Sequence, residues 1–175
     1  MMKPLHDIVG DVVASAAEKV GCNVTYLWGD WSYIADTLTR WNASEYTAGL
    51  KYPCICLYSP YEERRTMQGG REQSEATLEL LIMVNTLKDY TNEERDAVSF
   101  ENVLRPIYRA FISTLMDDPR IVRNYSGVPA HTYTENYRYG RLGVLMADNR
   151  PFADFLDVIE IKNLGLTFKE SCNNG

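Results

Sequence analysis

Two segments of the chain carry hydrophobic residues at three- and four-residue intervals, which is the spacing of an amphipathic helix. The first covers residues 5–20 and the second covers residues 91–117. Thr91 and Glu94 match a capping box at the start of the second segment. Pro106 lies inside it and predicts a kink, or a helix whose first turns form a separate element. We expect these two longer helices to pack on one face of a sheet.

Strand patterns surround the helices. Residues 54–58 form a compact apolar run with proline at both margins, which predicts a buried strand. Residues 75–86 alternate between polar and apolar side chains and then become apolar on both faces. A strand of that length would reach roughly 40 Å, so its Glu75 end should overhang the core. Further strands are predicted at residues 23–28, 131–139 and 155–168, the last as a strand pair or one strand bent at 163–165, while residues 31–50 predict a short helix or an irregular connection.

The segment between the two central strands is charged. Residues 61–74 contain three glutamates and three arginines, and only Tyr61 and Met67 are apolar. This segment should lie in water in the isolated subunit. The order of strand, charged segment and long strand predicts a β-hairpin with a projecting arm. The whole pattern predicts a single α+β domain over residues 1–175, with a mixed, mainly antiparallel sheet, two longer helices on one face and the projecting hairpin.

Composition and charge restrict the function classes. Hydrophobic residues make up 45% and charged residues 24% of the 175, so a packed core is expected. The net charge of -6 disfavours broad attraction to nucleic acid or anionic lipid, and we expect no sequence-specific nucleic-acid partner. The densest apolar run, residues 80–84, is too short to span a bilayer, so no membrane association is expected. The first residues lack the apolar core of a secretory signal, so no export is expected.

The cysteines show no spacing typical of a zinc site. Two of them, Cys54 and Cys56, lie two apart on a predicted strand and should share one face of it. Cysteine is among the most buried residue types, so we interpret this pair as core residues in a reducing compartment. The other two are Cys22 and Cys172.

Residue types that catalysis requires are sparse. Only His6 and His131 could shuttle a proton, and neither lies in a recognisable catalytic context, so surface or capping roles are predicted. Gly69 and Gly70 are not followed by the Lys-Ser or Lys-Thr pair of a phosphate-binding loop. We therefore expect neither enzymatic activity nor a metal or other cofactor.

One catalytic alternative has a specific pattern. Glu160 and Lys162 project a carboxylate and an ammonium from one face of a strand, as metal-dependent nucleases of the PD-(D/E)xK type require. The upstream acid of such a site could be Asp148 or Asp154. No Pro-Asp dipeptide precedes the pair, and Asp154 is close to it in sequence. A second alternative is a small host-interaction or regulatory binding module that uses an aromatic surface at Trp28, Trp31, Tyr33 and Trp41.

In layout, the chain resembles the tail-terminator and neck (head-to-tail joining) proteins of tailed bacteriophages, the group that includes the lambda tail terminator. The resemblance lies in an amphipathic helix at 5–20, a strand and charged hairpin at 53–74, and a long returning strand at 75–86. A long helix containing Leu104-Arg105-Pro106-Ile107-Tyr108 and a closing strand at 157–164 complete it. The resemblance covers most of the chain but leaves residues 31–50 and 119–145 unassigned.

The resemblance implies a non-catalytic virion subunit that forms a homo-oligomeric ring, typically a hexamer. Such a subunit is assembled in the host cytoplasm, resides in the tail or neck and contacts other tail or connector proteins. The overhanging hairpin would reach a neighbouring subunit or line the ring. The predicted contact residues are Glu62, Glu63, Arg64, Arg65, Arg71, Glu72, Glu75, Thr77 and Glu79.

Overall fold

The computed structural model describes residues 2–123, 127–139, 149–150 and 152–170. The helices are α1 (Leu5–Val20), α2 (Trp31–Arg40), α3 (Glu45–Gly49), α4 (Asn92–Arg95) and α5 (Arg105–Asp117), with a 3-10 turn η1 (Trp41–Ala43) and a π-helical segment η2 (Asp96–Leu104). The strands are β1 (Thr25–Gly29), β2 (Cys54–Tyr58), β3 (Glu63–Gln68), β4 (Arg71–Asn85), β5 (Thr132–Tyr139) and β6 (Leu156–Lys169). The predicted α+β class is confirmed.

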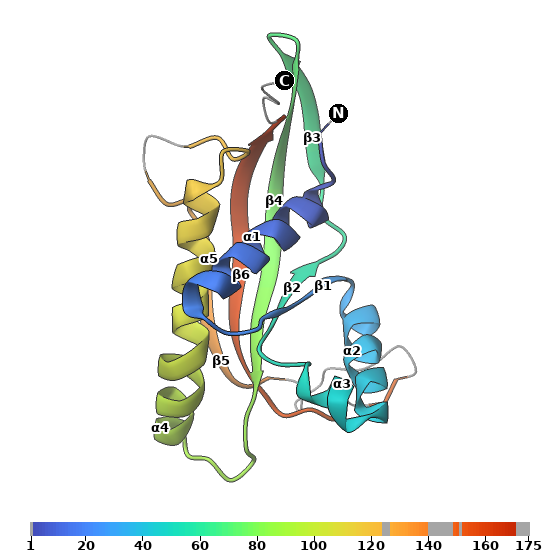
Figure 1. The fold of residues 1–175 in the computed structure, drawn as a ribbon, viewed down its shortest axis with the longest axis vertical. Helices are drawn as coiled ribbons and strands as arrows, with labels where there is room; N and C mark the ends of the chain where they lie inside the picture. Colours follow the sequence, from blue (N-terminus) through green and yellow to red (C-terminus); the bar gives the residue numbers. More distant parts are fainter. Residues whose placement is uncertain (1, 124–126, 140–148, 151, 171–175) are drawn as a thin grey trace.

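The strands form one mixed sheet in the order β1-β2-β4-β6-β5, and β3 pairs with β4 beside this path. Only the β1–β2 pairing is parallel among the described strands. Helices α1 and α5 lie across one face of the sheet, as predicted (Figure 1). We call this the helix-covered face. It holds the larger hydrophobic core, to which α1 contributes Val9 and Val12 and α5 contributes Phe111.

A second, smaller core lies on the opposite face of the sheet. Helix α2 packs Ile34 and Leu38 there against Cys54, Cys56 and strand residues of β4 and β6. The two faces explain why β4 is apolar at every position from Leu80 to Val84, as the sequence indicated, because each alternate side chain reaches a different core.

The charged segment after β2 forms a strand for most of its length. Glu63–Gln68 is β3, which pairs with β4 around a turn at Gly69 and Gly70. Both glycines have positive φ, of 60° and 78°, which a two-residue hairpin turn requires. The Glu75 end of the long strand does not overhang as predicted, because β6 pairs with β4 from Gln73 onwards. Among the described residues, 67–72 of the hairpin lie beyond the last β6 pair.

The helix from residue 92 to 117 continues without a break through three stretches, α4, η2 and α5, and the change from η2 to α5 lies just before Pro106. The capping box at Thr91 and Glu94 is present, and η2 follows α4 directly. At the end of η2, the N–H of Arg105 donates to the carbonyl of Phe100, five residues back. Pro106 is the second residue of α5 and directly follows the π-helical segment.

Strand β6 is one bent strand. Ile161 and Leu164 both face the helix-covered core although they are three residues apart. Leu78 and Leu80 of β4 lie opposite Leu164 and Ile161 of β6, so β6 has one residue more than β4 in this interval. Asn163, with a φ of 57°, lies in this bulge. The bend therefore changes the phase of the alternation and keeps both halves of β6 in the same core.

Candidate functional site

The structure places seven of the nine predicted contact residues on two opposite faces of the sheet. Glu63, Arg65 and Glu72 lie toward the helix-covered face and bind one another: Arg65 contacts Glu63 at 3.2 Å and Glu72 at 3.6 Å. Glu63 also accepts a hydrogen bond from the Ser74 hydroxyl at 3.1 Å. These carboxylates are therefore satisfied within the chain. Arg71 lies at the tip, and Glu62 lies in the connector between β2 and β3.

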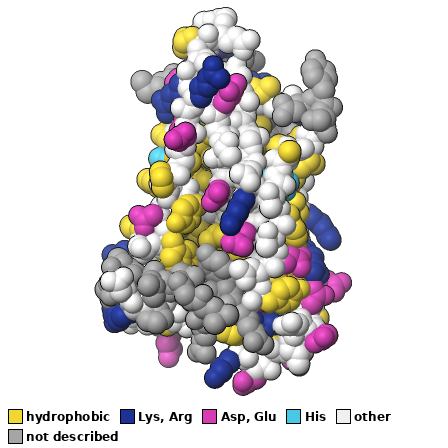
Figure 2. Space-filling view, turned by 180° about the vertical axis from the view of Figure 1, so that it is seen from behind, with side chains coloured by type: hydrophobic (Ala, Val, Ile, Leu, Met, Phe, Trp, Pro, Cys, Tyr) yellow, Lys and Arg dark blue, Asp and Glu magenta, His cyan; other side chains and the backbone are white. Residues whose placement is uncertain are grey.

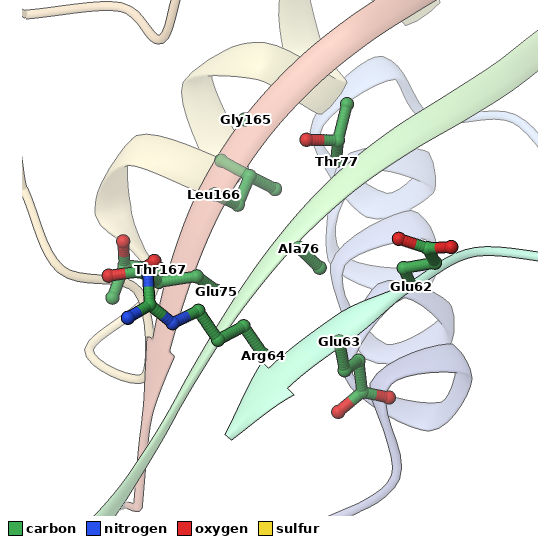
Figure 3. A pocket seen from close by; sticks show the side chains of 9 residues that line it. All are labelled: Glu62, Glu63, Arg64, Glu75, Ala76, Thr77, Gly165, Leu166 and Thr167. Carbon is green, nitrogen blue, oxygen red and sulfur yellow. The ribbon is translucent and has the colours of Figure 1, made fainter. Parts of the chain in front are cut away.

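The remaining predicted residues share the opposite face with residues from β6. We call this surface the open face; it consists of Arg64, Glu75, Thr77, Glu79, Glu160, Lys162 and Thr167. In the sheet register, Arg64 of β3 lies opposite Glu75 of β4, and Glu75 lies opposite Thr167 of β6. Figure 3 shows Arg64 reaching across β4 toward both of them. The smaller core covers only the end of this side of the sheet nearest α2, so most of the open face is exposed to solvent, whereas Glu160 and Thr167 are half-buried.

Two depressions mark the open face. The first lies where β3 leaves β4 and is lined by Glu62, Arg64, Glu75 and Thr77 (Figure 3). The second is lined by Tyr58, Glu79, Glu160 and Lys162 over the edges of Leu81 and Ile161. Figure 2 shows acidic and basic side chains interspersed on this side of the molecule, next to hydrophobic ones.

The open face gathers residues that the sequence assigned to two different functions. Glu79 belonged to the predicted assembly surface, whereas Glu160 and Lys162 belonged to the nuclease alternative. The carboxylate of Glu160 lies 3.9 Å from the ammonium of Lys162, as their spacing on one strand indicated. Sequence reasoning had no means to bring Tyr58 and Glu79 beside them, because the contact depends on the pairing of β2, β4 and β6.

The upstream acid of the nuclease pattern is engaged elsewhere. Asp154 forms an ion pair with Lys51, and its Oδ2 accepts a hydrogen bond from Tyr52 at 2.6 Å. Asp148 lies outside the described residues. Over the described ranges, no group of three or more His, Cys, Asp or Glu side chains is placed to hold a metal ion.

The aromatic residues of the binding-module alternative do not form one surface. Trp31 packs edge-on against Phe152 at a ring distance of 5.5 Å, as part of the smaller core. Trp28 is exposed and stacks on His6 at 4.0 Å on the helix-covered side. Tyr33 is also exposed, and its ring lies against Gly29. Trp41 is half-buried in η1.

Cys54, Cys56 and His131 occupy positions close to those predicted. Cys54 and Cys56 are buried with their sulfurs 3.5 Å apart, and burial raises the pKa of the Cys56 thiol. Cys22 is exposed, and Cys172 lies outside the described residues. His131 contacts the Tyr108 hydroxyl at 2.8 Å and the Pro129 carbonyl at 2.7 Å, next to β5.

Comparison with known proteins adds no family to this description, because neither the protein-family models nor the curated proteins contain a match to the chain. Among the described helices, none combines the length and the apolar character needed to cross a membrane.

Proposed function

We propose that this protein is a structural subunit of a tailed-bacteriophage virion that assembles into a homo-oligomeric ring at the tail-terminator or neck position. It acts by protein-protein contact, without catalysis, and abuts other tail or connector proteins. It is assembled in the host cytoplasm and resides in the virion.

The observation that supports this proposal is the difference between the two faces of the sheet. Helices α1 and α5 close the helix-covered face, whereas the open face presents Glu75, Thr77 and Glu79 to solvent along the length of β4. A bare sheet face joined to a two-stranded extension offers an area on which another protein can pack.

The charges of the open face favour a protein partner. Arg64 and Lys162 stand among Glu75, Glu79 and Glu160, so both signs are interspersed within one surface. A phosphate backbone would require a continuous basic track, whereas interspersed charges fix the register of a protein interface.

The hairpin tip and the open face are different surfaces of the same chain. Contact between one subunit's tip and the next subunit's face is therefore head-to-tail, the kind that closes a ring.

A shortened hairpin tests the proposal. Deletion of Met67, Gln68, Arg71 and Glu72 removes two residue pairs, keeps the glycine turn and leaves every pair between β4 and β6 in place. We expect this variant to keep the wild-type circular dichroism and nearly the same thermal midpoint. It should no longer form rings in light scattering and negative-stain microscopy.

A matched pair of charge reversals separates the open face from general surface charge. Glu75→Arg with Glu79→Arg should weaken ring formation, whereas Glu93→Arg with Glu101→Arg, on equally exposed positions of the α4–η2 helix, should leave it unchanged. The proposal fails if the wild-type protein stays monomeric at high concentration and antibody labelling finds none of it at the tail or neck of purified virions.

A further inference from the structure

The N-terminal segment before α1 runs beside β3 (Figure 1). Its backbone contacts the hairpin directly, because the N–H of Met2 donates to Oε2 of Glu72 at 3.2 Å. The side chain of Met2 packs against the core of the helix-covered face. Met2 is therefore fixed both to the domain core and to β4, in which Glu72 lies seventy positions further along the chain.

A second contact lies at the base of the hairpin. Nδ1 of His6 lies 3.3 Å from the hydroxyl of Tyr61, which belongs to the connector between β2 and β3. The His6 ring is held by its stack on Trp28, at 4.0 Å and 20° between planes. The backbone carbonyl of His6 accepts a hydrogen bond from the Tyr26 hydroxyl at 2.8 Å.

The two ring nitrogens of His6 face different polar groups. Nδ1 lies toward the Tyr61 hydroxyl, whose pKa is raised mainly by burial and then by the nearby Glu63 carboxylate. With the ring proton on Nε2, Nδ1 can accept a hydrogen bond from the Tyr61 hydroxyl. Nε2 faces Oδ1 of Asp7 at 3.6 Å. One tautomer of His6 therefore suits both of its polar neighbours.

We infer that residues 2–7, which comprise the segment before α1 and the first residues of that helix and are called here the N-terminal strap, hold the β3–β4 hairpin in the orientation that presents the open face to a neighbouring subunit. Both attachments, Glu72 and Tyr61, lie on the helix-covered side or at the base, and Arg64, Glu75 and Glu79 remain exposed. The strap therefore steadies the hairpin without covering the contact surface. A segment ordered before binding loses less entropy on binding, so the strap favours assembly. Only this link to assembly rests on the proposed function.

Isosteric substitutions test the strap. His6→Phe keeps the stack on Trp28 and removes the ring nitrogens, and Tyr61→Phe removes the hydroxyl that meets them. Each should raise hydrogen exchange of the β3 amides about fivefold, as expected for the loss of one hydrogen bond. The double variant should exchange no faster than the singles, because all three lose the same contact. Tyr108→Phe is the matched control, since it breaks the tyrosine–histidine pair with His131 and should leave β3 unchanged.

The outcomes separate the strap from the proposed function. Unchanged β3 exchange in both single variants, or additive effects in the double variant, would overturn the strap, whether or not rings form. If the wild-type protein forms no rings, the proposed function fails while the exchange measurement still decides the strap. If rings form more readily in His6→Phe than in the wild type, the strap inhibits assembly and the inference is wrong.

Discussion

Arg95 at the end of α4 and Asp157 at the start of β6 form an ion pair in which both side chains are fully buried, with Nη1 and Oδ1 3.3 Å apart. The guanidinium also donates to the carbonyls of Tyr90 and Leu87 and lies over the ring of Phe155. These contacts join the start of the long helix to the central sheet. They also satisfy most of the donors of a charge that has left water.

Breaking this pair should destabilise the protein strongly. Arg95→Met leaves the Asp157 carboxylate buried without its arginine, which typically costs about 3–5 kcal/mol. The double variant Arg95→Met with Asp157→Leu should recover part of the loss, since no lone charge remains buried. Urea unfolding of the three proteins measures both effects. A loss below about 1 kcal/mol for Arg95→Met would contradict a buried pair.

A second arginine should make stability depend on pH. Arg105 donates to both oxygens of Glu135, at 2.8 and 2.9 Å, and its hydrogen bonds hold the pKa of that carboxyl below its usual range. A lowered folded-state pKa stabilises the protein above the unfolded pKa, and the contribution is lost as the pH falls through the folded value. Arg105→Met should therefore cost about 1 kcal/mol at pH 7 and less at pH 3, measured as the free energy of unfolding.

The exposed Arg109 on the same helix provides the control for this measurement. Arg109→Met removes an identical charge and should leave the difference between pH 7 and pH 3 as in the wild type. Equal pH profiles for the two variants would show that the pair of Arg105 with Glu135 does not produce the acid sensitivity.

The bend of β6 depends on the backbone of Asn163. Its φ of 57° is a left-handed conformation that asparagine and glycine adopt far more easily than β-branched residues do. Asn163→Val should lower stability by about 1–2 kcal/mol, whereas Asn163→Gly should be nearly neutral. Lys162→Val is the control at the adjacent exposed strand position. Measured by thermal unfolding, its loss of stability should be smaller than that of Asn163→Val. Equal losses at the two positions would contradict this account.

Lys51 should anchor the region of α2 and α3 to the rest of the domain. Its ammonium is buried, pairs with Asp154 and donates to Oδ1 of Asn42 at 2.9 Å. Lys51→Met leaves Asp154 without its cation and should cost about 3 kcal/mol. Hydrogen exchange should rise most in α2, because Asn42 lies in η1, which directly follows that helix. Exchange that rises equally throughout the domain would show that the pair does not act locally.

Local patterns identified several elements closely. The bounds of α1 and β2 match the predicted ranges 5–20 and 54–58, because each carries a complete apolar period with a proline or glycine at its ends. The capping box located the start of α4, since it requires only residues three positions apart. The charged segment at residues 61–74 predicts a solvated segment and not strand β3, because it has no apolar alternation. Its strand structure comes from pairing with β4.

Contacts between distant segments had no sequence signal. Arg95 and Asp157 are sixty-two positions apart, and Lys51 and Asp154 are separated by more than a hundred. From the sequence alone, each of these charged side chains is expected at the surface. The burial of each one follows from tertiary packing, which brings its partner and the surrounding elements into contact with it.

The sequence by itself determined the α+β class, the two helices of one face and a charged hairpin beside a long strand, because period, caps and turns are local properties of the chain. Only the tertiary structure decided which hairpin residues bind one another within the chain and which lie on the open face. Strand pairing turns Glu63, Arg65 and Glu72 toward internal partners and brings Arg64, Glu75 and Glu79 onto one surface with Glu160 and Lys162. That separation follows from the alternation of side chains across a sheet, combined with a register that neighbouring residues do not specify.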